Sequence, residues 1–375
     1  MINYTVKLMP TPRQERQLKR WLVNLTGVFN WAVRKIELDA ADRRYYSLYD
    51  FKALLNGHGA KVGIPVQVLQ EVAAGAYQAW RECFSGLKRK PRLKGRRRRL
   101  NWIVFRQGSQ MTVRARHVDG LAVALGSMRF HRQEIPSGTL KRVRVIKRAS
   151  GWYGVLTIDA DPAAIPSGSG SVGIDPGFSS LLTLSTGEKI DRATELSRSA
   201  RRLAQAQRGC RHRLTARLQE RVGWQRKDRN HKLSRRLVSE NQLIAWSKDR
   251  HSGIAKKFGK SVQSSAHYQL REMLLYKSLI GGAQFLEVDA RNSTRRCSAC
   301  QALTGPTGWA GLKVRVWDCS ACGAHHDRDI NAAVNTLKLG QGICHESGHE
   351  AVSGIATKAR RRSSSRPQRS STCAR

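Results

Sequence analysis

Residues 287–333 read EVDARNSTRRCSACQALTGPTGWAGLKVRVWDCSACGAHHDRDINAA, and this stretch decides how the rest of the chain is interpreted. It contains two Cys-x-x-Cys pairs, Cys297 with Cys300 and Cys319 with Cys322, with eighteen residues between them. An acidic β-type segment precedes the first pair, and an Asp-Arg-Asp-Ile-Asn-Ala-Ala run follows the second. The sequence therefore predicts a metal-held knuckle inserted between two acidic segments of one site.

The four paired cysteines carry the strongest chemical signal in the chain. Two such pairs roughly 15–20 residues apart supply four thiolates for a closed, tetrahedral Zn²⁺ site. We expect structural zinc, and an iron–sulfur cluster is the less favoured alternative for this spacing. His325 and His326 follow the last cysteine and could compete as ligands, but four thiolates already complete the coordination shell of a zinc ion. The other cysteines are scattered singly, which argues against a disulfide framework: Cys83, Cys210, Cys344 and Cys373.

The charge balance predicts a polyanionic partner. The 375 residues include 68 Lys and Arg against 27 Asp and Glu, a formal net charge of +41. Such an excess destabilises a compact chain by self-repulsion unless a polyanion neutralises it, and nucleic acid releases counterions when it does so. No apolar run reaches the roughly 18–20 residues that span a bilayer, and the N-terminus lacks a signal-peptide core. We expect a soluble, cytoplasmic protein without a membrane partner.

The N-terminal half alternates between strand and helix patterns. Residues 2–8 alternate as a strand, and Thr11-Pro12 places a cap and a first-turn proline at the start of a helix. A second helical zone extends from about residue 49 to 84. Residues 101–160 are strand-like with regular Gly and Ser punctuation, which predicts a small antiparallel barrel or sheet. The composition of residues 161–171 is that of a linker.

A basic run, KRKPRLKGRRRR, separates these helical and strand-rich zones at residues 88–99. Charge runs are usually solvated, flexible segments. Here the position between two zones also suits a phosphate channel. We predict that its cationic residues bind nucleic acid: Lys88, Arg89, Lys90, Arg92, Lys94, Arg96, Arg97, Arg98 and Arg99.

The C-terminal half follows the order of an α/β domain of ribonuclease H type. A strand hairpin from residue 172 precedes a basic helical stretch over 191–239, a strand at 243–246 and a helix at 263–279. A strand at 284–289 and a last helix starting near Asp329 complete it. The segment from residue 358 to 375 is basic and of low complexity, and we expect it to be disordered.

Three acidic residues in separate segments are candidates for a carboxylate site. Asp175 follows an apolar strand, Asp329 begins a helix, and Glu287 lies mid-strand, where a buried carboxylate is costly without a partner or metal. Two Mg²⁺ ions held by several carboxylates activate water and stabilise the leaving oxygen of a phosphodiester. Each acid alone also has a structural interpretation, such as a turn or a helix N-terminus.

Several motifs, in this order along the chain, resemble the C-terminal half of the TnpB family. They are Gly173-Ile-Asp-Pro-Gly, Thr294-x-x-Cys-Ser-x-Cys, Cys319-x-x-Cys-Gly and Asp327-Arg-Asp-Ile-Asn-Ala-Ala. Leu-Leu-Tyr-Lys-Ser before the cysteines resembles the family's preceding helix. The family consists of transposon-encoded RNA-guided DNA nucleases related to type V CRISPR effectors. The resemblance covers about residues 170–340, with a weaker one at the N-terminus.

The resemblance implies a ribonuclease H-like RuvC domain with an inserted zinc ribbon, after a wedge-type β-barrel interrupted by a helical recognition domain. The implied boundaries are 1–10 and 96–165 for the barrel, 11–95 for the helical domain, 171–292 and 326–345 for the RuvC-like domain, 293–325 for the ribbon, and 346–375 for a basic disordered tail. The family's first and third acids correspond to Asp175 and Asp329, with Asp327 as a near neighbour.

The chain departs from the family pattern at the second acid. The family's strand ends in Glu-Asp-Leu, and here Ser247 occupies the position of that Glu. A serine hydroxyl cannot replace a carboxylate as a Mg²⁺ ligand. We weigh three interpretations. In the first, Glu287 on the next strand supplies the carboxylate, because neighbouring parallel strands end at one edge. In the second, the protein binds DNA under RNA guidance without cutting it. In the third, Glu240 or Asp249 is used.

The resulting expectation is an RNA-guided, Mg²⁺-dependent DNA endonuclease of a mobile element, with Asp175, Glu287 and Asp329 as catalytic ligands. Guide RNA and target DNA are the expected partners, and a monomer with its RNA is the expected assembly. The alternatives are a nuclease-dead guided repressor and a zinc-ribbon DNA-binding protein without a guide.

Overall fold

The computed structural model describes residues 1–106, 111–166, 168–191, 194–248, 265–289, 291–307, 311 and 313–346. Residues 347–375 of the predicted tail therefore lie outside the described residues. The chain forms two compact units, Met1–Ala163 and Ala164–Arg375. In the described residues, no helix is long and apolar enough to cross a membrane.

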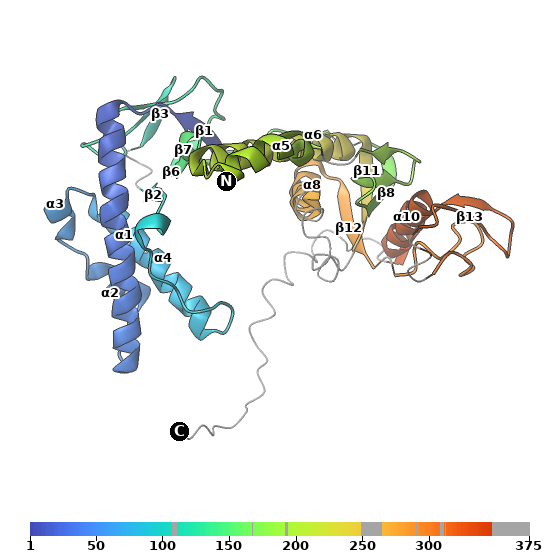
Figure 1. Ribbon diagram of the computed structural model, residues 1–375, viewed down its shortest axis with the longest axis horizontal. Helices are drawn as coiled ribbons and strands as arrows, with labels where there is room; N and C mark the ends of the chain where they lie inside the picture. The colour runs from blue at the N-terminus through green and yellow to red at the C-terminus, as the bar shows by residue number, and fades with distance from the viewer. Residues whose placement is uncertain are drawn as a thin grey trace. The chain divides into compact units, whose positions relative to one another are not determined.

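In its described residues, the first unit combines helices with antiparallel sheets (Figure 1). Its elements are β1 (Ile2–Leu8), α1 (Pro12–Ala41), α2 (Leu48–Ala53), α3 (His58–Val62), α4 (Val66–Phe84), a short 3-10 helix (Arg96–Arg98), β2 (Trp102–Phe105), β3 (Thr112–Arg114), β4 (His117–Asp119), β5 (Met128–Arg129), β6 (Thr139–Arg148) and β7 (Gly151–Asp159).

The predicted start of α1 is confirmed in detail. Thr11 is the N-cap residue, Pro12 is the first helical residue, and the Thr11 hydroxyl accepts a hydrogen bond from the Gln14 N–H. The Gln14 side chain in turn accepts from the Thr11 N–H, which completes a capping box. The amide of Gln14 also donates to the carbonyls of Leu125 and Ser127, so that the same residue fixes the helix start against a distant loop.

The predicted β-barrel does not close in the part of the chain that the structure describes. One sheet has the order β1-β7-β6-β2, and a separate three-stranded sheet has the order β3-β4-β5. A bridge between Leu8 and Phe130 joins β1 to the end of the second sheet. The strand pattern predicted antiparallel strands correctly, but closure depends on strand tilt and stagger, which alternation does not encode.

The second unit is built on a mixed sheet of order β10-β9-β8-β11-β12. Strands β8, β11 and β12 are parallel, and β9 returns antiparallel to β8 as the predicted hairpin. The elements are β8 (Gly170–Pro176), β9 (Leu182–Leu184), β10 (Lys189–Ile190), α5 (Glu195–Arg208), α6 (His212–Glu240), β11 (Asn241–Ser247), α8 (His267–Gly281), β12 (Gln284–Val288), β13 (Val316–Asp318), β14 (His325–Asp327) and α10 (Arg328–Glu346).

Helices cover both faces of this sheet. Ile174, Trp246 and Phe285 form one hydrophobic core with residues of α6 and α8. On the other face α10 packs so closely that a Cβ atom on Gly173 would overlap the carbonyl oxygen of Ala333. In Figure 1 the strands β8, β11 and β12 lie between α8 on one side and α10 on the other. This α/β layering agrees with the sequence-based expectation for the C-terminal half.

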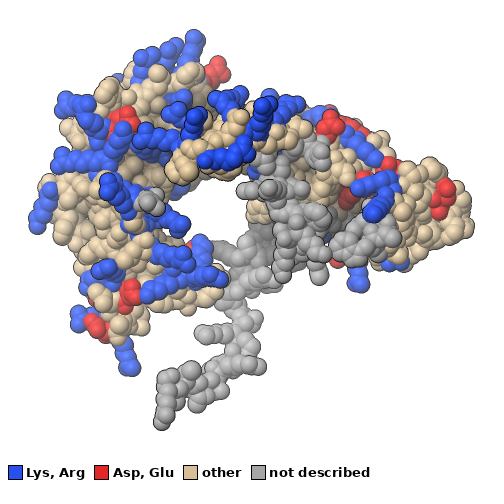
Figure 2. All heavy atoms as spheres, viewed as in Figure 1, with Lys and Arg blue, Asp and Glu red and all other residues tan. Residues whose placement is uncertain are grey.

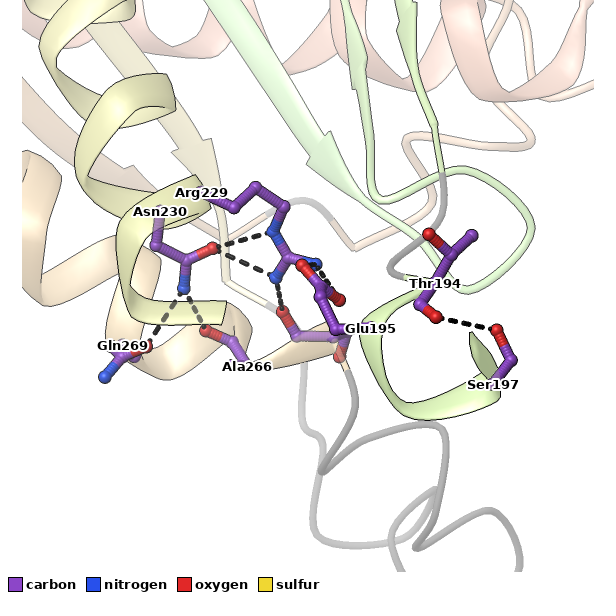
Figure 3. Close-up of polar contacts among 8 residues, drawn as sticks. Thr194, Glu195, Ser197, Arg229, Asn230, Ala266 and Gln269 are labelled. Atoms are coloured by element: carbon purple, nitrogen blue, oxygen red, sulfur yellow. Dashed lines mark hydrogen bonds and ion pairs between the residues drawn. The ribbon is translucent and has the colours of Figure 1, made fainter. Parts of the chain in front are cut away.

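A partly buried polar network joins α5, α6 and the entrance to α8 (Figure 3). The Arg229 guanidinium donates to both carboxylate oxygens of Glu195 at 3.0 Å, and to the Ser265 carbonyl at 3.0 Å. The neighbouring Asn230 donates to the Ala266 carbonyl and to Gln269. Desolvation by burial lowers the pKa of Arg229, and the attraction of Glu195 opposes this shift. The network therefore fixes where α8 begins.

Candidate metal centre and carboxylate site

The four predicted cysteines gather into one cluster. All four sulfur atoms lie within 4.8 Å of one another. The Cys297 and Cys322 sulfurs are 3.7 Å apart, and those of Cys300 and Cys319 are 3.6 Å apart. Zn–S bonds of about 2.3 Å in a tetrahedron separate the sulfurs by about 3.8 Å. The donor set and its spacing therefore fit a tetrahedral metal ion held by thiolates.

The backbone around each pair forms the same kind of knuckle. The Cys297 N–H donates to the Ala302 carbonyl, and the Cys319 N–H donates to the Ala324 carbonyl. Each knuckle turns through a residue with positive φ, Gln301 at 68° and Gly323 at 71°. Glycine adopts this conformation without steric cost, whereas the side chain of Gln301 makes the same conformation sterically costly. The two turns thus present all four sulfurs to one point.

Nearby side chains tune the cluster. The Thr304 hydroxyl, 3.1 Å from the Cys319 sulfur, is the largest cause that lowers the pKa of Cys319 to about 6. His326 is buried with its Nε2 3.0 Å from the Cys297 sulfur, and desolvation by burial lowers the pKa of its imidazole. His325 instead faces Asp318. The four cysteines therefore remain the group that could hold a metal ion, with His326 beside them.

Two asparagines of α10 fasten this knuckle to the helix, and sequence reasoning missed them. The amides of Asn331 and Asn335 both donate to the carbonyls of Ser293 and Arg296, at 2.7–3.1 Å. Asn331 also accepts from the Ser298 N–H at 2.8 Å. The signal was present, because two asparagines four residues apart lie on one helix face. The four-cysteine cluster is thereby tied to the helix that covers the sheet.

Asp175 lies on the α10-facing side of the sheet. Trp246 of β11 pairs with Ile174 of β8, so one residue further along Ser247 comes level with Asp175. Successive side chains of a strand point to opposite faces. Asp175 therefore shares the face of Gly173, which α10 contacts.

Asp329 stands in the first turn of α10, the helix that covers this face. Arg315 reaches both its carboxylate, at 3.4 Å, and the Ser179 hydroxyl in the turn after β8, at 2.9 Å. Asp327 has a different role: its Oδ1 caps the helix by accepting from the N–H groups of Asp329 and Ile330. Burial alone would raise the pKa of the Asp327 carboxyl group. Its hydrogen bonds with Lys189 and with those N–H groups outweigh burial, so that the pKa is lowered.

Ser247 and Glu287 occupy different faces of the sheet. Ser247 pairs with Val288, in the row of Asp175, and it is buried. Within the described residues its hydroxyl has no hydrogen-bond partner. Glu287 pairs with Trp246, one row away, and therefore points to the face that α6 and α8 cover. There it forms an ion pair with Arg271 of α8.

The structure therefore brings together only part of the predicted carboxylate set. Asp175 and Asp329 belong to the same side of the sheet, whereas Glu287 belongs to the other. Among the described residues, the four cysteines are the one group of three or more close potential ligands, and the three carboxylates do not form a second. Glu240 ends α6, at the opposite end of β11 from Ser247, and Asp249 lies outside the described residues.

The basic run at residues 88–99 is exposed and fastened to α1. Asn30 makes two hydrogen bonds to the backbone of Lys94, at 2.8 and 3.0 Å. The Thr26 hydroxyl accepts from the Leu100 N–H at 3.1 Å. Lys94 is partly buried, and the side chain of Arg97 is not among the described side chains. The remaining predicted cations are exposed: Lys88, Arg89, Lys90, Arg92, Arg96, Arg98 and Arg99.

Further basic residues gather along α5 and α6, where Figure 2 shows a dense row of Lys and Arg side chains. Most of these are exposed: Arg198, Arg201, Arg202, Arg208, Arg213, Arg217, Arg221, Lys232, Arg235 and Arg236. Sequence reasoning recognised the stretch as basic and helical but did not name these residues as binding residues.

Comparisons with known proteins agree with this architecture. The model of the Cas12f1-like TNB domain matches residues 267–336, and the OrfB IS605 helix-turn-helix domain model matches residues 1–38. A Streptomyces pristinaespiralis protein named as a candidate RNA-guided DNA endonuclease is 36% identical over 208 residues. That match covers 52% of this chain and 51% of the relative, so the chain spans about half the length of that relative.

Two further proteins match over most of the chain. InsQ of Escherichia coli K12, also named as a candidate RNA-guided DNA endonuclease, is 23% identical over 91% of this chain and 92% of its own length. The fold resembles that of the protein in a Cas12f1–sgRNA–target DNA complex, with a TM-score of 0.55, 13% identity, and coverage of 85% of this chain and 82% of that one. In sequence the chain is therefore similar to the OrfB IS605 and Cas12f1-like domain models and to proteins named as candidate RNA-guided DNA endonucleases, and in fold it is similar to Cas12f1.

Proposed function

We propose that the protein is an RNA-guided DNA endonuclease encoded by a mobile element. One observation carries this proposal: Asp175 lies on the sheet face covered by α10, and this helix carries Asp329 in its first turn and is fastened by Asn331 to the four-cysteine cluster. The full-length similarity to InsQ and the names of both relatives support it. The exposed cations of the basic run and of α5 and α6 would hold guide RNA and DNA by their phosphates.

In this proposal the second unit corresponds to a RuvC-like domain, residues 171–292 and 326–345, with a zinc ribbon at 293–325. Cys297, Cys300, Cys319 and Cys322 would hold structural Zn²⁺. Asp175 and Asp329 would hold catalytic Mg²⁺, which activates water and stabilises the leaving oxygen of a phosphodiester. Arg315, which bonds to Asp329 and to Ser179, would position the Asp329 carboxylate until the metal binds.

A second candidate function is RNA-guided DNA binding without cleavage, and the strand register favours it. A serine fills the place beside Asp175 where the family has its second acid. Glu287 would replace that acid only by leaving Arg271 and reaching the opposite face of the sheet. Both candidates share every nucleic-acid contact, and they differ only in the presence of a third carboxylate.

A plasmid-cleavage assay with co-expressed guide RNA separates the two candidates. The nuclease proposal predicts Mg²⁺-dependent cuts by the wild-type protein and none by Asp175→Ala. Target binding without any cut would establish the guided binder instead. Glu287→Gln, which removes the charge but keeps the shape, tests the third ligand: a loss of cutting would assign Glu287 to the site, and retained cutting would exclude it.

Ser247→Glu provides the complementary test. The substitution places a carboxylate in the row of Asp175. If the wild type lacks a complete ligand set, the Ser247→Glu variant should therefore cut DNA faster than the wild type does. RNA that copurifies with a defined sequence would exclude the third interpretation, a zinc-ribbon protein that binds DNA without a guide.

A further inference from the structure

A cavity of about 130 Å³ lies in the first unit, far along the chain from the carboxylate site. It is formed by the C-terminal half of α1, the loop that follows it, and the C-terminal half of α4. Aromatic rings dominate its lining, among them Tyr45, Tyr77, Trp80 and Phe84. Its charged lining residues are Asp39, Arg44 and Arg81. Neither the metal cluster nor the sheet of the second unit contributes to it.

Two of these rings are exposed to an unusual degree. Tyr45 has an exposed fraction of 77% and Phe84 one of 58%. Phe84 stacks on Trp80 with ring centroids 5.0 Å apart and an interplanar angle of 24°. Tyr77 is held in place because its hydroxyl donates to the Tyr46 carbonyl at 2.8 Å. Rigid rings at the mouth of a cavity offer flat faces on which another planar group can stack.

A polar group in the lining lacks a partner. Asp39 is 4% exposed, and one carboxylate oxygen accepts a hydrogen bond from Lys35 at 2.8 Å. Within the described residues its other oxygen, Oδ2, is buried without any hydrogen-bond partner. A buried acceptor without a donor costs free energy, which a ligand N–H would recover. The cavity therefore suits a flat molecule that carries an N–H donor.

Positive charge surrounds the same cavity. Arg44 and Arg81 belong to its lining, and Lys90 from the basic run lies with its Nζ 6.0 Å from the centroid of Trp80. Lys90 also forms an ion pair with Glu37 of α1. Asn30 fixes the backbone of the same run at Lys94, and Lys90 is the cation of the run that lies beside a ring of the cavity. A ligand with an aromatic part and phosphates on both sides satisfies every one of these features.

We infer that this cavity binds one unstacked nucleobase of a single-stranded nucleic acid. The base would stack on the exposed rings and donate an N–H to Asp39, while the flanking phosphates contact Arg44, Arg81 and the basic run. This inference rests on the proposed function, since that function supplies the nucleic-acid partner. It adds a base-binding site that is separate from the carboxylate site and from general phosphate contacts.

The test measures binding of the full-length protein to short labelled oligoadenylate and oligocytidylate, as RNA and as DNA. Raised salt weakens the phosphate contacts, so that the contribution of the base becomes visible. The variants are Tyr45→Ala, Phe84→Ala and Asp39→Asn, and Tyr49→Ala is the matched control. Tyr49 is 82% exposed on the nearby α2 and does not line the cavity. Thermal unfolding of each variant checks the fold.

Loss of one stacking ring is expected to lower affinity roughly 5- to 150-fold. Tyr49→Ala should bind like the wild type. A 2-aminopurine in the oligonucleotide should change its fluorescence with the wild type and not with Phe84→Ala. The RNA and DNA arms identify which nucleic acid supplies the base. Folded Tyr45→Ala and Phe84→Ala proteins that bind both arms as tightly as the wild type would overturn the inference. A wild type that binds neither RNA nor DNA would instead refute the proposed function.

Discussion

Lys277 shows how one buried residue makes the stability of the second unit depend on pH. It is 6% exposed, and its ammonium donates to the His231 carbonyl and to the Ser234 hydroxyl, so that it joins α8 to α6. Desolvation by burial lowers the pKa of Lys277 from 10.5 to about 8. Between these values the unfolded chain binds more protons than the folded one.

The free energy of unfolding should therefore rise as the pH increases from about 8 to about 10.5, by up to roughly 3 kcal/mol. Below pH 8 the charged lysine imposes its full desolvation cost. Lys277→Met removes the titration, so the difference between wild type and variant in urea unfolding isolates it. Parallel pH profiles for the two proteins would contradict this account of Lys277.

Gly173 explains at the residue scale why the motif Gly-Ile-Asp-Pro-Gly begins with glycine. A side chain there would overlap the Ala333 carbonyl and press against the backbone of Leu337. Gly173→Ala should reduce the free energy of unfolding by about 1–3 kcal/mol, the usual cost of overpacking. Gly223 in α6 is the matched control, because a Cβ there meets nothing within 4 Å.

Gly223→Ala should raise the stability of the helix by about 0.5–1 kcal/mol. Chemical denaturation of both variants measures the contrast. If Gly173→Ala is as stable as the wild type, α10 does not pack on β8 as described.

At the scale of elements, the asparagine pair of α10 joins the metal cluster to the sheet. Asn331 and Asn335 contribute four hydrogen bonds to the chain just before Cys297. Replacing both by alanine should cost about 2–6 kcal/mol, at about 0.5–1.5 kcal/mol for each hydrogen bond. It should also speed the release of zinc to a chelator, as a colorimetric zinc indicator would show. Asn241→Ala is the control, since that side chain bonds to Leu237 away from the cluster. Equal release rates would show that the helix does not support the metal site.

The elements also show how far the sequence predicts this fold. Two Cys-x-x-Cys pairs predicted the cluster, because ligand type and spacing are local properties. Capping residues predicted the helix from Pro12. Short strand-like segments predicted the hairpin β8–β9 and the strands β11 and β12. Closure of the N-terminal strands was predicted wrongly, because it depends on tilt and stagger. The face of Glu287 was not predictable either, since a register shift of one residue exchanges the two faces of a strand.

At the scale of the whole molecule, the charge of +41 should make nucleic-acid binding strongly dependent on salt. Each phosphate contact contributes about 0.7–0.9 to the slope of log K against log salt. Arg96→Ser, Arg98→Ser and Arg99→Ser together should therefore reduce that slope by about 2–3 for guide RNA. Arg13, Arg16 and Arg20 on α1 provide a control set outside the basic run. An equal reduction for both sets would mean that charge alone, and not the basic run, determines binding.

The proposed function requires that guide RNA directs this protein to DNA and that Asp175 then serves in cutting it. The most direct measurement is cleavage of a plasmid target by purified protein with its guide RNA, with Mg²⁺ and with EDTA, for the wild type and Asp175→Ala. The proposed function predicts that the wild type cuts at the guide-matched site with Mg²⁺ and not with EDTA, and that Asp175→Ala binds the target without cutting it. Equal cutting by both proteins, or guided binding by the wild type without any cut, would contradict it.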